Sequence, residues 1–339
     1  MQYRKLGNTD IEASVVGFGA WAIGGWMWGG ADESDSIDAL DVAIGAGVNL
    51  IDTAPMYGYG QSEEIVGRAI AGRRDKVVLA TKCGLTWSET EWEEGRGVLH
   101  FYGDEKGRTD GPVKYRVYKY LRPEAIMREV EESLARLRTD YIDLYQTHWQ
   151  DDSTPIADTM DVLLRLKEQG KIRAIGVSNA TPDQIGEYEE CGPVDVDQEK
   201  YNLLDRKIEQ NGALELCREK GISVLAYSPL ANGLLTGKIQ PNREFGDGDL
   251  RQGNPRFSPE NIKRINAMLG DFRPIADSHG VSPGQLVIAW TAARYEKMHV
   301  LCGARNAVQA VDNAKAGDVR LSVDEVAAID AIVKAADVA

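Results

Sequence analysis

The chain has 339 residues, of which 43% are hydrophobic and 27% are charged. These proportions are typical of a folded globular protein with a large core, and they exclude a disordered chain. With 53 acidic residues against 39 basic ones, the formal net charge is −14. Such a charge argues against nucleic acid and anionic membranes as partners, so an anionic ligand needs a local basic site.

The four cysteines, Cys83, Cys191, Cys217 and Cys302, are far apart and form no CxxC pair. This spacing predicts neither a disulfide framework nor a zinc site. The first residues are not followed by the apolar segment of a secretory signal, and no apolar run approaches the roughly 18 residues of a membrane span. These features together predict a cytoplasmic protein.

Short apolar segments alternate with amphipathic ones along the chain. Eight segments rich in β-branched residues are predicted strands: 14–17, 49–52, 76–82, 141–145, 172–177, 194–196, 222–226 and 299–301. Apolar residues at helical spacing predict helices between them, including one over 126–137 and one over 262–275. Eight such units without a break in composition predict a single (β/α)8 TIM barrel domain over residues 1–339. A doubly wound parallel sheet is the competing architecture.

Three features go beyond a plain barrel. Residues 2–13 precede the first barrel strand, and their Gly-Asn pair predicts a hairpin that closes the barrel floor. Segments 281–293 and 322–335 are predicted helices in addition to those of the eight units. Residues 85–122 form a connection far longer than the roughly two to six residues usual for a βα loop. That length predicts a long βα loop over the active-site mouth.

Residues 17–22 fit a loose dinucleotide-binding fingerprint after a strand. The fingerprint has to open a helix, but glycines and tryptophans follow here and make a poor helix. We therefore reject a Rossmann site at this position.

Four polar residues lie at or just past predicted strand ends: Asp52, Tyr57, Lys82 and His148. In a barrel these ends meet at one mouth, so the four side chains are expected to converge. A lysine beside a tyrosine lowers the pKa of the phenol towards neutral, and a carboxylate keeps the lysine charged and oriented. A histidine can hydrogen-bond a substrate carbonyl. The set therefore predicts general acid–base chemistry near pH 7.

A second candidate site lies near the C-terminus. Residues 301–306 lead from a strand through a glycine turn into a helix, and they include Arg305. A helix N-terminus with an arginine binds phosphate through backbone N–H groups, the helix dipole and the guanidinium. Arg305 therefore predicts the local basic site that an anionic cofactor needs. An ordinary helix start with a solvated arginine is the alternative interpretation.

Most tryptophans fall on segments expected at the barrel mouth, namely Trp21, Trp26, Trp28, Trp87, Trp92 and Trp149. Aromatic walls suit sugar rings and hydrophobic carbonyl compounds. Packing of a long loop onto the barrel is the alternative explanation.

These residues belong to longer motifs that resemble the aldo-keto reductases, from Leu6 to about Ala331. The matching segments are 49–58 with 62–64, 80–82, 137–144, 170–179, 228–230 with 233–238, and 303–305. Residues 21–30 resemble a bacterial branch that includes general-stress reductases and glycerol- and sugar-oxidising enzymes. The resemblance implies an (α/β)8 barrel and NADP(H)-dependent oxidation or reduction of an aldehyde, ketone or sugar.

The resemblance places the family's catalytic tetrad on Asp52, Tyr57, Lys82 and His148. It implies that Tyr57 is the general acid in reduction and the base in oxidation, and that Lys82, paired with Asp52, tunes it. His148 then positions the carbonyl, and hydride passes to or from the nicotinamide without a metal. Trp26, Trp28, Trp87 and Trp149 are the expected substrate-binding residues.

The resemblance also implies a cofactor site. The matching positions are Trp21, Ser178, Asn179, Gln198, Tyr227, Ser228, Leu230, Gly233, Leu235, Lys238, Gly303, Arg305, Gln309 and Asn313. Of these, Ser178, Asn179 and Gln198 are expected to hold the carboxamide, and Tyr227 to stack on the nicotinamide. Arg305 is expected to meet the 2′-phosphate, which predicts a preference for NADP(H) over NAD(H).

Two functions from other classes compete with the reductase. A cofactor-sensing regulatory subunit would keep the same tetrad and cofactor site. A barrel hydrolase would use two carboxylates, such as Asp52 and Glu199, but it leaves Tyr57, Lys82 and Arg305 without a role. A metal site is not expected, because the four histidines are isolated from one another in the sequence.

Overall fold

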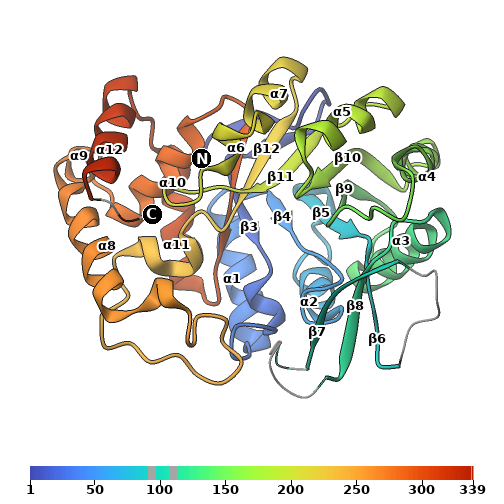
Figure 1. Cartoon of the computed structure of the whole chain (residues 1–339), viewed down its shortest axis with the longest axis horizontal. Helices are drawn as coiled ribbons and strands as arrows, with labels where there is room; N and C mark the ends of the chain where they lie inside the picture. The colour runs from blue at the N-terminus through green and yellow to red at the C-terminus, as the bar shows by residue number, and fades with distance from the viewer. Residues whose placement is uncertain (91–96, 105, 107–112, 337, 339) are drawn as a thin grey trace.

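The computed structural model describes residues 1–90, 97–104, 106, 113–336 and 338. Within these residues, eight parallel strands close into a barrel in the order β10-β11-β12-β13-β3-β4-β5-β9 (Figure 1). In chain order they are β3 (Val16–Gly19), β4 (Leu50–Asp52), β5 (Val78–Cys83), β9 (Ile142–Thr147), β10 (Ile172–Ser178), β11 (Val196–Lys200), β12 (Ser223–Tyr227) and β13 (Met298–Gly303). The predicted TIM barrel is confirmed, and the doubly wound sheet is excluded because that sheet has open edges.

Helices surround the barrel (Figure 1). They are α1 (Glu33–Gly45), α2 (Gln61–Ala69), α3 (Pro123–Leu137), α4 (Ile156–Glu168), α5 (Pro182–Cys191), α6 (Lys207–Gln210), α7 (Ala213–Lys220), α8 (Pro259–Asp271), α9 (Arg273–Ser278), α10 (Pro283–Ala293), α11 (Ala307–Lys315) and α12 (Val323–Ala336). Helix α3 shows why they form: Pro123 occupies the first turn, where no N–H is needed. Its residues Ile126, Val130 and Leu137 are fully buried on the predicted face.

A hairpin closes the amino-terminal end of the barrel, as predicted. β1 (Tyr3–Lys5) pairs antiparallel with β2 (Glu12–Ser14). Leu6 is fully buried against inward-facing aliphatic residues of the barrel strands. Gly7 at the turn has a φ of +55°, and a Cβ there would lie 2.2 Å from the carbonyl oxygen of Asp195. Only glycine allows this close approach, so Gly7 lets the turn of the hairpin pack directly against the backbone at Asp195.

The C-terminal part contains the expected additional helices α10 and α12. The single helix expected over 262–275 is wrong, because α8 ends at Asp271 and α9 begins at Arg273. Pro274 lies in the first turn of α9, where it has no N–H to donate and would clash with a carbonyl if α8 continued. The apolar residues on both sides still face the core, which is why the periodicity runs through the break.

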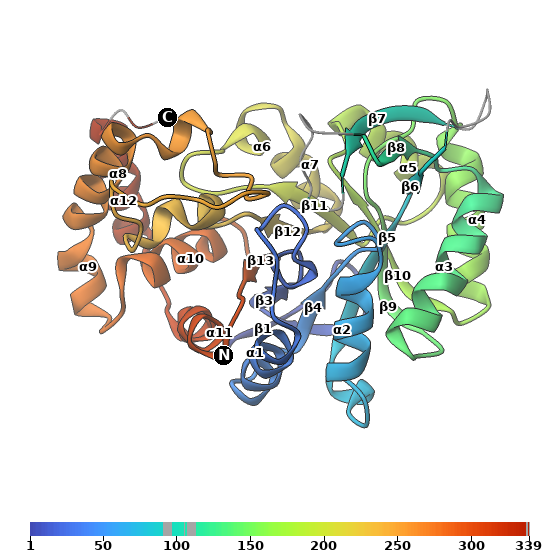
Figure 2. The ribbon, with the colours of Figure 1, turned by 90° about the horizontal axis from the view of Figure 1, so that it is seen from below.

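The long βα connection over residues 85–122 contains regular structure of its own. β6 (Leu85–Ser88), β7 (Val98–Gly103) and β8 (Tyr115–Lys119) form an antiparallel sheet in the order β6-β8-β7, here called the added sheet. Figure 2 shows it at the end of the barrel opposite the N-terminus. In the described part of the chain, no helix combines the length and apolar character needed to cross a bilayer.

Candidate active site

The carboxyl ends of three neighbouring barrel strands bring the four polar residues together. Asp52 ends β4, Lys82 is the penultimate residue of β5, and His148 directly follows β9. These strands are adjacent in the barrel order, and Tyr57 lies in the connection after β4. Parallel strands all point their carboxyl ends the same way, which explains why residues almost 100 positions apart share one mouth.

Lys82 is held in one geometry by three hydrogen bonds. Its Nζ donates to the two carboxylate oxygens of Asp52, at 2.8 and 2.9 Å, and to the carbonyl of Thr53 at 2.8 Å. Both side chains of the ion pair are buried. Burial lowers the pKa of Lys82, and the Asp52 carboxylate opposes this shift. The ammonium therefore has its full set of donors satisfied while lacking contact with water.

Two amides complete the surroundings of the Asp52 carboxylate. Gln146 Nε2 donates to it at 3.3 Å, and Gln198 Nε2 donates at 3.2 Å. A buried carboxylate needs such donors as well as its ion-pair partner. Asp52 thus links Lys82 to Gln198, a residue of the expected carboxamide site.

Tyr57 lies among the other members of the tetrad. The Lys82 Nζ is 4.9 Å from the centre of its ring, and the His148 ring meets it edge-on with centroids 5.7 Å apart. Burial raises the pKa of Tyr57 well above its usual range, and the Asp52 carboxylate raises it further. The expectation that Lys82 brings this pKa towards neutral is therefore wrong for this structure, because Asp52 already compensates the ammonium. The phenol keeps its proton at neutral pH.

His148 is fixed by its backbone and is uncharged. Its N–H donates to the carbonyl of Cys83 at 2.9 Å, and its carbonyl accepts from Asn179 Nδ2 at 3.1 Å. Burial lowers the pKa of His148 well below its usual range, and the charges of Lys82 and His100 lower it further. A neutral imidazole carries one N–H donor, which suits it to hydrogen-bond a carbonyl oxygen.

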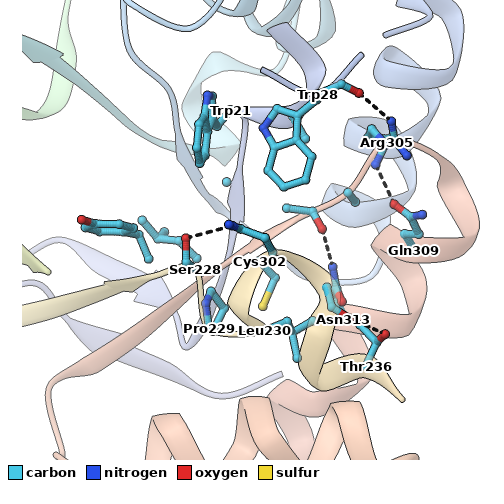
Figure 3. A pocket seen from close by; sticks show the side chains of 18 of the residues that line it. Trp21, Trp28, Ser228, Pro229, Leu230, Thr236, Cys302, Arg305, Gln309 and Asn313 are labelled. Carbon is cyan, nitrogen blue, oxygen red and sulfur yellow. Dashed lines mark hydrogen bonds between the residues drawn. The ribbon is translucent and has the colours of Figure 1, made fainter. Parts of the chain in front are cut away.

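A cavity of about 420 Å³ extends from Asp52 and Tyr57 to the start of α11. Figure 3 shows Trp21 and Trp28 on one side of it, Ser228 and Leu230 on the other, and Arg305 at one end. The expected cofactor residues that line the cavity are Trp21, Tyr227, Ser228, Leu230, Gly233, Lys238, Gly303, Arg305, Gln309 and Asn313. The cavity therefore connects the two sites that the sequence analysis identified separately.

Ser178, Asn179 and Gln198, the three expected carboxamide residues, are not among the residues that line this cavity. Hydrogen bonds connect them to one another and, through Asn179, to Tyr227, which does line it. Ser178 Oγ donates to the carbonyl of Gln198 at 2.8 Å, and Asn179 Oδ1 accepts from the Tyr227 hydroxyl at 2.8 Å. Among the described residues, the buried Gln198 Oε1 has no hydrogen-bond partner. A buried acceptor without a donor is costly, and an amide N–H of a ligand would satisfy it.

The loop after β12 has an unusual backbone. Ser228, Ala231 and Asn232 have φ values of +53°, +46° and +56°, and Gly233 has +93°. Left-handed residues other than glycine are uncommon and persist where the surroundings hold them. Here Asn202 Nδ2 donates to the Ser228 carbonyl at 2.9 Å. Leu235, expected to bind cofactor, has a fully buried side chain and can contribute only its backbone.

The outer end of the cavity is basic. Arg305 Nη1 donates to the Trp28 carbonyl at 3.2 Å, and the Arg305 N–H donates to Gln309 Oε1 at 3.0 Å. Arg243 and Arg251 line the same cavity. Within the described ranges no carboxylate forms an ion pair with Arg305, and burial and the charge of Arg251 lower its pKa. Arg243 and Arg251 could not be predicted from the sequence, because they lie in an irregular segment without a motif.

Two other predicted residues at this end are already partnered. Asn313 Nδ2 donates to the Gly303 carbonyl at 3.0 Å, and this contact closes the turn before α11. Lys238 Nζ forms an ion pair with Asp312 at 2.6 Å. A paired lysine has less charge to offer a phosphate, so Arg305 is the stronger anion ligand of the two.

Residues 238–258, here called the covering segment, contribute Lys238, Ile239, Arg243, Phe245 and Arg251 to the lining of the cavity. Leu250 N–H donates to the Met27 carbonyl at 3.0 Å, which joins the segment to the opposite rim. Arg251 binds Asp249 at 2.6 Å, and its guanidinium lies 5.2 Å from the Trp28 ring. The segment therefore presents charged groups to the cavity while its backbone is hydrogen-bonded to Met27.

The four tryptophans expected to bind substrate lie in two different places in the structure. Trp28 lines the cavity that also contains Tyr57, and its carbonyl accepts a hydrogen bond from Arg305. Trp26 is only 6% exposed and stacks on Phe101 with centroids 5.8 Å apart. It joins the added sheet to the barrel, which is the packing role that the sequence analysis gave as the alternative.

Trp87 and Trp149 are half-buried around the same aromatic cluster. Trp87 meets Tyr59 at a centroid distance of 5.4 Å, and Trp149 meets His100 at 4.9 Å. Trp149 follows His148 directly and so remains next to the tetrad. Trp92 lies outside the described residues.

The paired-carboxylate alternative does not fit the geometry. Gln198 points its amide to Asp52 inside the barrel. Side chains of successive strand residues point to opposite faces, so Glu199 lies on the other side of the barrel wall from Asp52. Across the described residues, no group of three or more metal-ligating side chains is present.

The closed barrel and the convergence of a tyrosine, an ion-paired lysine and a histidine beside a basic cavity define an oxidoreductase of the aldo-keto type. Residues 15–334 match the model of the Aldo/keto reductase family. The chain belongs to this family, which confirms the resemblance found in the sequence. It is therefore an oxidoreductase that acts on carbonyl compounds.

Similar proteins are named for different activities. The chain is 42% identical over 328 residues to the NADH-specific methylglyoxal reductase of Escherichia coli (strain K12), with 95% of each chain covered. The glycerol dehydrogenase AKR11B4 from Gluconobacter oxydans matches with a TM-score of 0.85 and 37% identity, covering 99% of this chain and 96% of that one. An aldo/keto reductase from Klebsiella pneumoniae in complex with NADP and acetate matches with a TM-score of 0.66 and 29% identity, covering 94% and 91%.

Proposed function

We propose that the protein interconverts a carbonyl group and an alcohol by NADP(H)-dependent hydride transfer, with Tyr57 as general acid and base. The observation that carries this proposal is one continuous cavity with the buried Tyr57 at its inner end and Arg305 at its outer end. The related reductase from Klebsiella pneumoniae, whose complex contains NADP, supports a nicotinamide cofactor.

The inner end of the cavity fits a nicotinamide. Gln198 Oε1 is a buried acceptor without a donor in the described part of the chain, and a carboxamide N–H supplies one. Tyr227 lines the cavity and is oriented by its hydrogen bond to Asn179, so its ring is placed to stack on a flat ligand. A bound nicotinamide supplies the hydride in reduction and accepts it in oxidation.

The tetrad handles the proton. In reduction, neutral His148 donates a hydrogen bond to the carbonyl oxygen, and the Tyr57 hydroxyl gives its proton to that oxygen as the carbon accepts hydride. The raised pKa of Tyr57 keeps this proton in place before reaction. Lys82 then stabilises the phenolate that forms, and Asp52 holds Lys82 in position. Oxidation of the alcohol uses the same contacts in reverse, because the two directions share one transition state.

The outer end of the cavity favours a cofactor with a 2′-phosphate. Arg305, Arg251 and Arg243 gather there, and Arg305 has no carboxylate partner among the residues described. A phosphate that meets such a guanidinium gains roughly 1.5–3 kcal/mol, or about tenfold to a hundredfold in affinity. The relative from Escherichia coli is named NADH-specific, so cofactor choice is the first property to measure in this chain.

The direct test is turnover with a panel of aldehydes, ketones and sugars, followed by the loss of NADPH or NADH absorbance. We expect reduction with both cofactors, a higher kcat/KM with NADPH, and no loss of activity in EDTA. Binding of NADPH, seen as quenching of tryptophan fluorescence, without turnover on any carbonyl would contradict the proposal and favour a cofactor-sensing regulatory subunit.

We also propose that residues 1–339 form one domain and that the enzyme acts in the cytoplasm on uncharged small molecules. The barrel strands span residues 16–303, and the last helix, α12, packs on α8. A single cooperative unfolding transition followed by both circular dichroism and fluorescence is expected. Two separate transitions would contradict the single domain.

A further inference from the structure

The edge strand β7 of the added sheet contains a β-bulge at His100. Leu99 pairs with Tyr118 and Phe101 pairs with Val117, so His100 has no partner residue on β8. In a regular strand, successive side chains point to opposite faces, whereas a bulge re-aims the extra side chain. The bulge therefore allows the His100 side chain to point to the same face of the sheet as a neighbouring side chain.

As a result, two consecutive side chains of β7 face the aromatic residues of the barrel mouth. Phe101 stacks on the buried Trp26 at 5.8 Å. The His100 ring lies 4.9 Å from the Trp149 ring, at an interplanar angle of 47°. Leu99 and Tyr102, on either side of this pair, are exposed. A strand without the bulge would direct His100 away from the mouth.

This placement brings His100 close to the tetrad. Trp149 directly follows His148, and His100 is near enough that a proton on it would lower the pKa of His148 further. The His148 ring in turn meets the Tyr57 ring at 5.7 Å. His100 is thus a polar group that the added sheet places against Trp149, the residue next to the tetrad member His148. The sequence analysis treated His100 as isolated because more than 40 residues separate it from His148.

The lowered pKa of His100 makes its side chain an uncharged imidazole at neutral pH. No hydrogen bond to either of its ring nitrogens is found in the described part of the protein, and the side chain is half-buried. Burial lowers the pKa of His100, and the charge of Lys119 lowers it further. A neutral imidazole offers one donor and one acceptor, which matches a hydroxyl group and not an anion.

We propose that His100 binds a hydroxyl group of the substrate outside the reacting carbonyl, so that the enzyme prefers uncharged hydroxyaldehydes and hydroxyketones to plain carbonyl compounds. This inference rests on the proposed reductase function. The Trp149 ring beside His100 provides the apolar surface on which the carbon chain of such a substrate lies.

The test compares glycolaldehyde with propanal, which carries a methyl group in place of the hydroxyl. We expect the wild-type protein to have the higher kcat/KM for glycolaldehyde with NADPH. His100→Ala should lower this value about fivefold to tenfold, mainly through KM, because one hydrogen bond to a neutral group is lost. The same variant should change kcat/KM for propanal by less than about twofold.

Two further variants make the result specific. His100→Gln keeps a donor and an acceptor and should retain a preference for glycolaldehyde. Tyr102→Phe changes an exposed side chain of the same strand and should leave both substrates unaffected. Equal losses on both substrates, or no loss on glycolaldehyde, would overturn the inference. If the wild-type protein reduces neither aldehyde nor any other carbonyl, the proposed function itself fails.

Discussion

The covering segment and the added sheet both lie at the carboxyl ends of the barrel strands, and they differ in the charge of the side chains that they present. The covering segment (238–258) faces the cofactor cavity with Arg243 and Arg251. The added sheet instead presents rings to the aromatic residues of the mouth, with Phe101 on Trp26 and His100 on Trp149. Figure 2 shows both regions at the same end of the molecule.

The two regions are also held by different forces. The covering segment is tied at its far end by Arg256, whose guanidinium binds both carboxylate oxygens of Asp205 at 2.8 and 2.9 Å. The added sheet is held by burial of Trp26, Leu85 and Val117. Ionic contacts weaken with salt, whereas apolar packing does not. From this difference we expect a charged ligand to bind beside the covering segment and an uncharged ligand to bind beside the added sheet.

Among the described residues, the connection between β7 and β8 of the added sheet meets the covering segment at Lys106. Lys106 forms an ion pair with Asp247 at 2.9 Å, and its carbonyl accepts from the Met27 N–H at 3.2 Å. Met27 also binds Leu250 of the covering segment. Residues 27–28 therefore contact both covers, and the two halves of the active site share a wall.

The largest expected effect on turnover comes from substitution of Tyr57. Tyr57→Phe removes the proton donor and should lower kcat by about 10²- to 10⁴-fold, while the affinity for NADPH stays unchanged. Tyr59→Phe is the matched control, because the Tyr59 hydroxyl is buried without a hydrogen-bond partner among the described residues. Full turnover by Tyr57→Phe would refute the assigned role.

The charged region is tested through cofactor choice. Arg305→Ala should reduce the ratio of NADPH to NADH affinity about tenfold to a hundredfold, since a charge-assisted contact to the 2′-phosphate is lost. Lys238→Ala should have a smaller effect, because Lys238 is already paired with Asp312. Fluorescence titrations at low and high salt measure both. An unchanged ratio in Arg305→Ala would show that another group binds the phosphate.

The anchor of the covering segment should have a moderate effect. Asp205→Asn releases Arg256 and should weaken NADPH binding about twofold to fivefold without changing kcat, because the pair is partly exposed. A double-mutant cycle with Arg256→Gln isolates the contact. The pKa of Asp205 is lowered to about 2 in the folded protein. The ion pair therefore stabilises the fold fully above about pH 4, the pKa of an unfolded aspartate, and this stabilisation is lost only as the pH falls towards 2. A loss of kcat with unchanged affinity would contradict this role.

The smallest effect concerns stability under the added sheet. Glu129 accepts a hydrogen bond from the Gly84 N–H at 2.9 Å, just before β6, and burial raises its pKa to about 8. The folded protein therefore favours the protonated carboxyl group of Glu129. Its contribution to stability is complete below pH 4.5, the pKa of an unfolded glutamate, and is lost as the pH rises to about 8. Glu129→Gln should therefore raise Tm relative to wild type at pH 8.5 but not at pH 5. An equal shift at both pH values would contradict the titration.

Local signals predicted the repeated parts of the molecule well. The eight barrel strands and helix α3 follow from β-branched segments and from apolar residues at helical spacing. The same periodicity failed at Pro274, where the buried face continues through a change of helix. Sequence distance failed for His100, because a bulge and a long connection bring it to Trp149.

The amino-acid sequence by itself determined the barrel, its N-terminal hairpin, the family and the residues at the strand ends, because these depend on local patterns and on motifs. Only the tertiary structure decided that Trp28 lies with the cofactor cavity, that Trp26 is a packing residue, and that Arg251 joins Arg305. It also decided that Tyr57 holds its proton. Burial, ion pairing and the path of long connections set these properties, and each depends on groups that are far apart in the chain.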